Sequence, residues 1–254
     1  MKYIILITAV LILISCENKK NETQNVKENT EMTKSNNYTP LSEKLDEKKQ
    51  NFENKADDEV KRIYAEGIQA VVDAGILDNA LNVGDIAPNF SLKNASGNEV
   101  ILESRLKDGP VILVWYRGGW CTYCNITLQR LQSELPNFQN YNASLIAITP
   151  EVPDSSLSTS EKHDLQFDVL SDIGQKVSEK YGVAFQLTDE VAARYEKSFG
   201  LSEYNNDKSK KLPLVATYVI DTNGKITYAY IDADYRNRAE PRDIIEALEK
   251  LDSN

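Results

Sequence analysis

The chain of 254 residues is poor in metal-binding side chains, with one histidine and three cysteines. A structural zinc site usually needs four Cys or His ligands, so these few residues leave little room for one. Basic residues are also outnumbered, since 29 Lys and Arg stand against 39 Asp and Glu and give a net charge of −10. This excess of acidic residues argues against binding to nucleic acid and against electrostatic docking to anionic lipid.

The chain also lacks a hydrophobic run of membrane-spanning length. The N-terminal run at residues 4–14 falls short of the roughly 20 apolar residues that a transmembrane helix needs, but it suits the core of a signal peptide. It ends in Leu13-Ile14-Ser15-Cys16, which resembles the lipobox of bacterial lipoproteins. The resemblance implies that residues 1–15 are removed and that Cys16 becomes lipidated. The chain is then anchored to a membrane in the bacterial cell envelope, outside the cytoplasm. The alternative is an ordinary secretory signal with an incidental cysteine.

Two segments of different character follow the apolar run. Residues 16–40 contain few large apolar side chains and cannot bury enough surface to offset their chain entropy, which predicts a flexible polar linker. Over residues 41–82 the apolar residues recur mainly at spacings of three, four and seven. This spacing predicts a helical extension with one apolar face, and Gly75 is suited to end it.

The remaining chain, residues 83–254, is predicted to form one α/β domain with a thioredoxin fold. A turn at residues 94–98 separates two short apolar runs and predicts a hairpin. The elements expected after it are a strand at 111–116, a helix at 126–138, a strand at 145–148, a short strand at 169–170, a helix at 177–181, a hairpin at 214–231 and a last helix from Pro241. The leading hairpin and a segment at about 150–172 are additions to the thioredoxin order of elements.

Cys121 and Cys124 form a Cys-x-x-Cys motif directly after the expected central strand, where a helix begins. The free N–H groups and the positive end of a helix dipole stabilise an anion there. A thiolate is the nucleophilic form of cysteine, so this position favours redox chemistry. Arg117 can add positive charge, Gly118 and Gly119 let the backbone bend closely around the site, and Trp120 can shield the sulfur from water.

Other interpretations of the motif are weaker. A structural disulfide across so short a loop would constrain little chain entropy. A zinc site would have only His163 to add to the cysteine pair, and the charged neighbours of His163 indicate a solvated surface residue. Haem attachment needs a histidine after the second cysteine, where Asn125 stands. The charged segment at residues 232–238 is interpreted as a solvated loop rather than as a substrate-binding one.

Four segments are similar to peroxiredoxins of the AhpC/TSA type, in particular to a peroxiredoxin-like subgroup with a Cys-x-x-Cys site. They are residues 83–92, 116–125, 216–221 and 234–241. The resemblance implies a thiol peroxidase that needs no cofactor. Its thiolate attacks a peroxide, becomes a sulfenic acid and is trapped as a disulfide, which a thioredoxin-like donor then reduces.

The chain departs from the usual family pattern in two places. Peroxiredoxins carry Pro-x-x-x-Thr-x-x-Cys, which puts Cys124 at the peroxidatic position, Cys121 at the Thr and Arg117 at the Pro. The thioredoxin pattern Trp-Cys-x-x-Cys points instead to Cys121 as the nucleophile, and the sequence leaves this open. Val215 stands where the family places an arginine or a cis-proline, so Arg117 or Arg236 would have to supply the missing charge.

Three functions are consistent with these patterns. The first is a peroxidase that reduces hydrogen peroxide or organic hydroperoxides through a Cys121–Cys124 disulfide. The second is an envelope thiol–disulfide oxidoreductase that acts on protein cysteines, and the third is a non-enzymatic lipoprotein with a structural disulfide. The leading hairpin and the segment at 150–172 favour the first.

Overall fold

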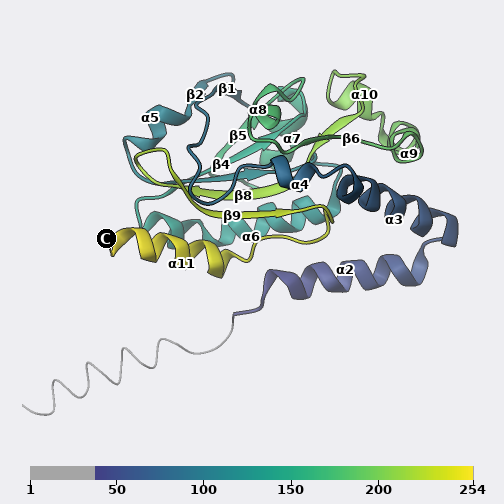
Figure 1. Ribbon diagram of the computed structural model, residues 1–254, viewed down its shortest axis with the longest axis horizontal. Coiled ribbons are helices and arrows are strands. Elements are labelled where there is room, and N and C mark those ends of the chain that lie inside the picture. Colours follow the sequence, from purple (N-terminus) through teal and green to yellow (C-terminus); the bar gives the residue numbers. More distant parts are fainter. Residues whose placement is uncertain (1–37, 254) are drawn as a thin grey trace, which may run out of the picture. The chain divides into compact units, whose positions relative to one another are not determined.

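A computed structural model describes residues 38–253, of which those from Pro40 onward belong to one compact unit. Its centre is a seven-stranded sheet with the strand order β2-β1-β5-β4-β3-β8-β9, and β6 and β7 form a separate pair (Figure 1). The strands are β1 (Ser91–Asn94), β2 (Glu99–Ile101), β3 (Val111–Trp115), β4 (Ser144–Thr149), β5 (Asp168–Ser171), β6 (Ala184–Gln186), β7 (Lys211–Pro213), β8 (Val215–Ile220) and β9 (Ile226–Asp232). The helices are α2 (Leu41–Lys55), α3 (Asp58–Asp73), α4 (Ile76–Asn79), α5 (Leu102–Leu106), α6 (Thr122–Gln139), α7 (Pro153–Lys162), α8 (Lys176–Lys180), α9 (Asp189–Phe199), α10 (Leu201–Tyr204) and α11 (Pro241–Asp252).

Strand β3 is the centre of the thioredoxin-type arrangement. It pairs in parallel with β4, so that Leu113 lies opposite Ile146, and antiparallel with β8, so that Leu113 also lies opposite Tyr218. All five residues of β3 are buried, as expected for a continuous apolar run in a strand that is covered on both faces. The elements β3, α6, β4, β5, α8, β8, β9 and α11 follow one another in the order predicted for residues 111–254, which confirms the thioredoxin fold.

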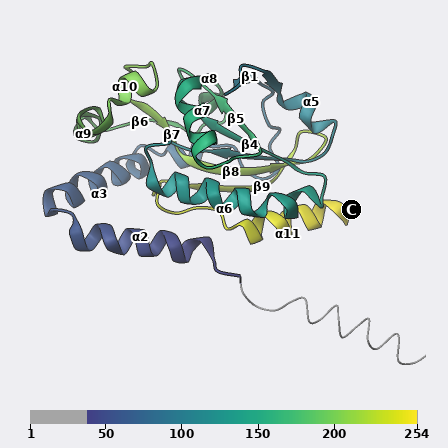
Figure 2. The same ribbon diagram turned by 180° about the vertical axis from the view of Figure 1, so that it is seen from behind.

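The two faces of β3 belong to two different cores, because successive side chains of a strand point to opposite sides. Ile112 and Val114 pack with residues of α6 and α11, which cover one face of the sheet (Figure 2). Leu113 and Trp115 pack into the other core, together with Tyr181. Helix α6 is thus fixed along its length, and its first turn is held at the carboxyl end of β3.

The hairpin and the added segment are also as predicted. Strands β1 and β2 pair antiparallel, and Gly97 in their turn has a positive φ of 83°. The segment at 150–172 contains α7 and β5, and β5 lies between β1 and β4 in the sheet. It therefore links the leading hairpin to the central strands.

The helical extension consists of separate helices rather than one. Helix α2 ends at Lys55 because Ala56 turns to an extended conformation with ψ of 147°, and α3 begins at Asp58. Gly75 has a left-handed φ of 62° after the end of α3 and so ends that helix, and the short helix α4 follows it within the extension. Leu41 and Leu45 of α2 are buried against the main body.

Residues 184–213 were given no element in the sequence analysis, yet they form β6, α9, α10 and β7. Helix α9 begins at a recognisable cap, because the Thr188 hydroxyl accepts a hydrogen bond from the Val191 N–H. It ends at Gly200, which has a left-handed φ of 70°. This segment contributes two aromatic side chains to the site described below.

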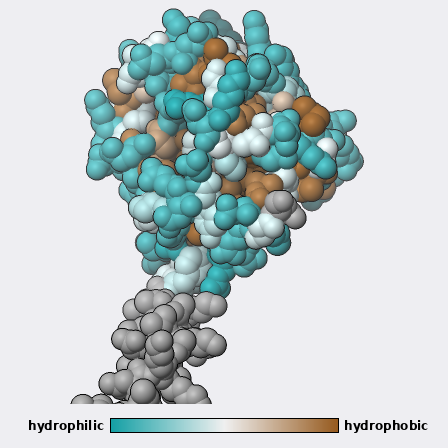
Figure 3. Space-filling view, turned by 90° about the vertical axis from the view of Figure 1, so that its left-hand side faces the viewer, coloured by the Kyte–Doolittle hydropathy of each residue, from teal (hydrophilic) through white to brown (hydrophobic). Residues whose placement is uncertain are grey.

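The signal peptide at residues 1–15, Cys16 and nearly all of the linker at 16–40 lie outside the described residues. Among the described residues no helix combines the length and the apolar character needed to cross a membrane. The boundary between residues 82 and 83 stays a prediction. Figure 3 shows the side where α5 and α11 lie, which is mostly hydrophilic with small separate hydrophobic groups.

Candidate active site

Cys121 and Cys124 lie where β3 is followed by helix α6. Cys121 is the residue just before the helix, and Cys124 lies in its first turn. Both are free thiols and both are buried, with exposed fractions of 4% for Cys121 and 0% for Cys124. The positive end of the helix dipole is thus directed at the pair, which favours a thiolate.

Cys124 has the surroundings of a thiolate. Nη2 of Arg238 donates to its Sγ over 3.3 Å. Burial opposes ionisation, but the hydrogen bond from the Cys121 thiol and the charges of Arg238 and Arg117 lower the pKa of Cys124 to about 5. Cys124 is therefore ionised at neutral pH.

Cys121 carries the proton of the pair. Burial raises its pKa well above the ordinary value, and the hydrogen bond to Cys124 and the charge on that sulfur raise it further. Yet Cys121, and not Cys124, lines an open pocket of about 580 Å³. The cysteine that lines the pocket and the ionised cysteine are thus different, and we assign the charge to Cys124 because Arg238 donates directly to its sulfur.

Arg117, predicted to add charge, is buried beneath the site with an exposed fraction of 2%. Its guanidinium lies 3.9 Å from the ring centre of Tyr235, and its Nη2 donates to the Tyr195 hydroxyl at 2.5 Å. Its Nε and Nη1 make no hydrogen bond within the described part of the chain. The predicted charge is therefore present, and aromatic rings rather than carboxylates surround it.

The predicted roles of Trp120 and the two glycines agree with the geometry. Trp120 stacks on Phe199 with ring centres 4.3 Å apart and forms a wall of the pocket beside Cys121. A Cβ on Gly118, whose φ is 150°, would overlap the Trp120 indole, and a Cβ on Gly119 would overlap the Thr159 hydroxyl. The loop before Cys121 can follow this path only without side chains at these positions.

Glu151 is a buried carboxylate that the sequence analysis missed, with an exposed fraction of 0%. Its Oε1 accepts from the Gly119 N–H at 2.7 Å, and its Oε2 accepts from the hydroxyls of Tyr116 at 3.0 Å and Thr149 at 3.2 Å. Burial raises the pKa of Glu151 to about 6, against the effect of these hydrogen bonds, and the nearby charge of Cys124 raises it as well. Glu151 therefore both holds the active-site loop and places negative charge behind the thiolate.

Two expectations need correction. Arg236 does not supply the missing charge, because it pairs with Asp234 and Glu53, and Arg238 is the arginine on Cys124. The segment at 232–238 is not simply solvated, since Tyr235 covers Arg117. His163 lies at the surface, partly exposed, with its Nδ1 at 2.8 Å from Nε2 of Gln129. Within residues 38–253 no cluster of His, Cys, Asp and Glu could hold a metal ion.

The residues that the sequence analysis missed come from distant parts of the chain. Tyr195 and Phe199 belong to α9, for which no element was predicted. Arg238 lies in a segment whose charge density suggested solvent. Glu151 carried a usable signal, because it follows the buried strand β4, which is parallel to β3, and the carboxyl ends of neighbouring parallel strands meet at one edge of the sheet.

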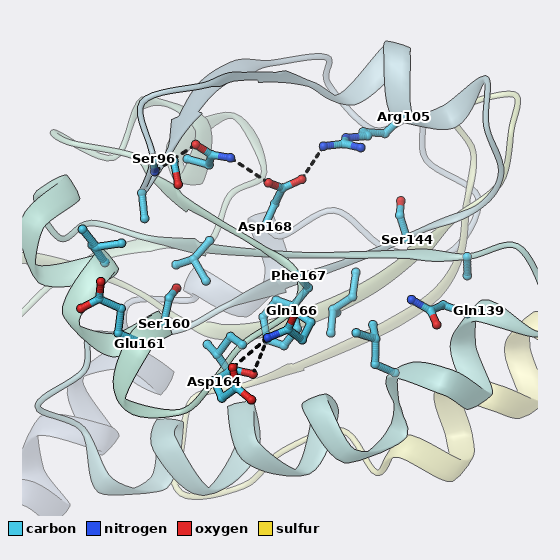
Figure 4. A pocket seen from close by; sticks show the side chains of 18 of the residues that line it. Ser96, Arg105, Gln139, Ser144, Ser160, Glu161, Asp164, Gln166, Phe167 and Asp168 are labelled. Carbon is cyan, nitrogen blue, oxygen red and sulfur yellow. Dashed lines mark hydrogen bonds and ion pairs between the residues drawn. The ribbon is translucent and has the colours of Figure 1, made fainter.

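A second cavity, of about 680 Å³, lies away from the cysteines (Figure 4). The carboxylate of Asp168, one of its lining residues, forms an ion pair with Arg105 and accepts a hydrogen bond from Asn94. None of the predicted site residues lines it. We therefore place the chemistry at the smaller pocket that opens onto Cys121.

Comparison with known proteins agrees with this geometry. The model of the AhpC/TSA family matches residues 83–229. Peroxiredoxin Q of Triticum aestivum chloroplasts is 28% identical over 156 residues, which are 61% of this chain and 62% of the wheat protein. The corresponding protein of Oryza sativa subsp. japonica is 29% identical over 179 residues, 70% of each chain.

Solved structures show the same fold at lower identity. Peroxidoxin BcpB from Mycobacterium tuberculosis superposes with a TM-score of 0.54 at 20% identity, over 67% of this chain and 98% of that one. The reduced 2-Cys peroxiredoxin of Plasmodium vivax gives a TM-score of 0.54 at 19% identity, over 68% of this chain and 83% of that one. In both comparisons about a third of this chain lies outside the shared fold.

Proposed function

The chain belongs to the AhpC/TSA family of peroxiredoxins, and from this premise we propose that it is a thiol peroxidase in which Cys124 attacks the peroxide and Cys121 resolves the product. The observation that carries this assignment is the contact of Arg238 with the Cys124 sulfur at the start of α6. The register of the peroxiredoxin motif, which puts Cys124 at the peroxidatic position, supports the same choice.

The reaction follows from the ionisation of the pair. The Cys124 thiolate attacks one peroxide oxygen, the O–O bond breaks, and the leaving oxygen takes a proton to become water or an alcohol. Cys124 is then a sulfenic acid. Cys121 gives up its proton and attacks the Cys124 sulfur, so that an S–S bond forms and the hydroxyl leaves as water. The substrates are hydrogen peroxide and organic hydroperoxides.

Single cysteine variants test the assignment. In stopped-flow mixing with hydrogen peroxide, Cys121→Ser should react once and accumulate a sulfenic acid on Cys124, which a dimedone-type probe labels. Cys124→Ser should react no faster than a free thiol. Labelling of Cys121 in the Cys124→Ser variant would reverse the two roles, and absence of labelling in both variants would contradict a peroxidase.

The proposal also covers the electron donor and the location. A thioredoxin-like protein reduces the disulfide, as the family resemblance implies. Cys16 carries the lipid anchor that holds the chain in the bacterial cell envelope outside the cytoplasm, and the lipobox-like residues 13–16 support this. Cells fed an alkyne-tagged fatty acid should label the wild-type chain and not Cys16→Ser. Equal labelling of both would contradict the anchor.

A further inference from the structure

The pocket that opens onto Cys121 is lined by positive charge, whereas the whole chain is negatively charged. Its lining residues include the cations Lys48, Lys55 and Arg117 and no Asp or Glu, although the chain has 39 acidic residues and 29 basic ones. Much of the remaining lining is aromatic, including Tyr195 and Phe199 from α9. Such a pocket favours a ligand that carries negative charge.

Helix α2 supplies the rim of this pocket. Lys48, Phe52 and Lys55 are spaced by four and three residues, so they lie on one face of the helix, and the two lysines are about 10 Å apart along its axis. Lys49, the neighbour of Lys48, pairs with Asp234 at 3.8 Å. Lys48 and Lys55 pair with no carboxylate within residues 38–253 and are available to a ligand.

Arg117 adds a buried cation to the lining of the pocket, which it shares with Cys121. It is almost fully buried, and its Nε and Nη1 have no hydrogen-bond partner among the described residues. A buried guanidinium with unsatisfied donors is costly unless an acceptor reaches it. Because Arg117 and Cys121 line the same pocket, the buried positive charge of Arg117 attracts an anion in the pocket toward Cys121.

We propose that this pocket binds a low-molecular-weight thiol that carries a negative charge, and that this thiol reduces the Cys121–Cys124 disulfide by attacking Cys121. The inference rests on the proposed function only in that the two cysteines form a disulfide. Attack at Cys121 fits the geometry, because Cys121 lines the pocket whereas the fully buried Cys124 does not. A thioredoxin-like donor would use the same sulfur.

The reduction of the Cys121–Cys124 disulfide takes two thiol–disulfide exchange steps. The incoming thiolate forms a bond with the Cys121 sulfur, the S–S bond breaks, and Cys124 leaves as the thiolate that Arg238 stabilises. A second molecule of the thiol attacks the incoming sulfur of the mixed disulfide. Cys121 is then released and takes a proton, and the two small thiols leave as their own disulfide. Two electrons pass from the two thiols to the protein.

Three small thiols of equal length test the charge preference on the full chain. The disulfide is formed with diamide, which does not depend on peroxide reactivity, and its reduction by 2-mercaptoethanesulfonate, 2-mercaptoethanol and 2-aminoethanethiol is followed by tryptophan fluorescence. When each rate is divided by the concentration of the ionised thiol, the sulfonate should react about tenfold faster than the alcohol at low salt, and the amine should be slowest. Added salt should reduce the preference.

Paired variants on α2 locate the preference. Lys48→Gln combined with Lys55→Gln should lower the sulfonate-to-alcohol rate ratio severalfold. Lys44→Gln, on the same helix but exposed and outside the pocket, should keep the wild-type ratio. Equal rates for the three thiols, or a ratio unchanged in the double variant, would overturn the inference. Failure of the peroxidase proposal would appear separately, as a diamide-formed disulfide in a chain inert to peroxide.

Discussion

Arg238 supplies at the thiolate the charge that the family pattern leads one to expect at position 215, where this chain has Val215. Replacing Arg238 with Leu removes the donor at 3.3 Å from Cys124 and raises the pKa of that thiol. We expect the second-order rate with hydrogen peroxide at pH 6 to fall about twofold, because a rise of roughly one pKa unit from about 5 lowers the ionised fraction of Cys124 from about 0.9 to about 0.5. Arg105→Met, which breaks an ion pair elsewhere, should leave the rate unchanged.

The pH dependence of the peroxide reaction reports the ionisation of Cys124. Because its pKa is lowered to about 5, the rate should be level from pH 7 upward and fall as the pH drops through that value, when the thiolate is protonated. Stopped-flow measurement in a series of buffers gives the midpoint. A midpoint near the ordinary pKa of a free thiol, about 8.5, would contradict the assignment.

Glu151 should leave the midpoint of this profile nearly unchanged. Its pKa of about 6 lies above the Cys124 pKa of about 5, so Glu151 is mostly protonated at the pH at which Cys124 titrates. Glu151→Gln therefore removes little charge there, and it keeps an oxygen that can accept from the Gly119 N–H. A large shift of the midpoint between wild type and variant, measured by stopped flow, would contradict this order of ionisation.

Gly119 has no room for a side chain. Gly119→Ala would push a methyl group against the buried Thr159 hydroxyl, and we expect a loss of about 1–3 kcal/mol in the free energy of unfolding, typical of overpacking. Combining it with Thr159→Ala removes the overlapping atom and should recover part of the loss in urea unfolding. No recovery in the double variant would show that the strain lies in the backbone instead.

The two cysteines, Arg117 and Trp120 could be predicted because they are neighbours in the sequence, and the start of a helix at Cys121 fixes their relation. Arg238, Tyr195 and Glu151 could not be predicted in the same way. Each reaches the site from a different element, and its direction depends on tertiary packing rather than on local spacing.

At the level of elements, α2 depends on a cap from the far end of the chain. The Glu240 carboxylate accepts hydrogen bonds from the backbone N–H groups of Leu41 and Ser42 at 2.9 and 2.7 Å, where a helix N-terminus favours an anion. Loss of such a cap costs about 1 kcal/mol. Glu240→Ala should therefore speed amide hydrogen exchange in α2 severalfold, whereas the exposed Glu246→Ala should not. Unchanged exchange would show that the cap is dispensable.

Most strands and the last helix were predictable because a continuous apolar run indicates a buried strand and regular apolar spacing indicates a helix. The break between α2 and α3 was not, since apolar spacing continues across Ala56 and only the backbone shows the turn. Helix α9 carried a usable signal that was overlooked. Its buried residues Val191, Ala192 and Tyr195 lie on one face, between the Thr188 cap and Gly200.

At the scale of the whole molecule, residues 41–82 are part of the folded body rather than an appendage. Leu41 and Leu45 share a core cluster with Tyr116 and both cysteines, and burial of one such leucine contributes about 1.5–3 kcal/mol. A chain starting at Pro40 should keep the stability of the full chain in urea unfolding. A chain starting at Val83 should lose several kcal/mol, and equal stability of the two would contradict this packing.

Helix α2 lies outside the stretch that the family model matches, residues 83–229, yet it forms the rim over Cys121. The rim lysines Lys48 and Lys55 and the arginine that contacts the Cys124 sulfur, Arg238, are thus encoded in separate parts of the gene. Substitution of the lysines can change which molecules reach Cys121 while Arg238 keeps Cys124 reactive, so related chains can diverge in their choice of reaction partner with an unaltered pair of sulfurs.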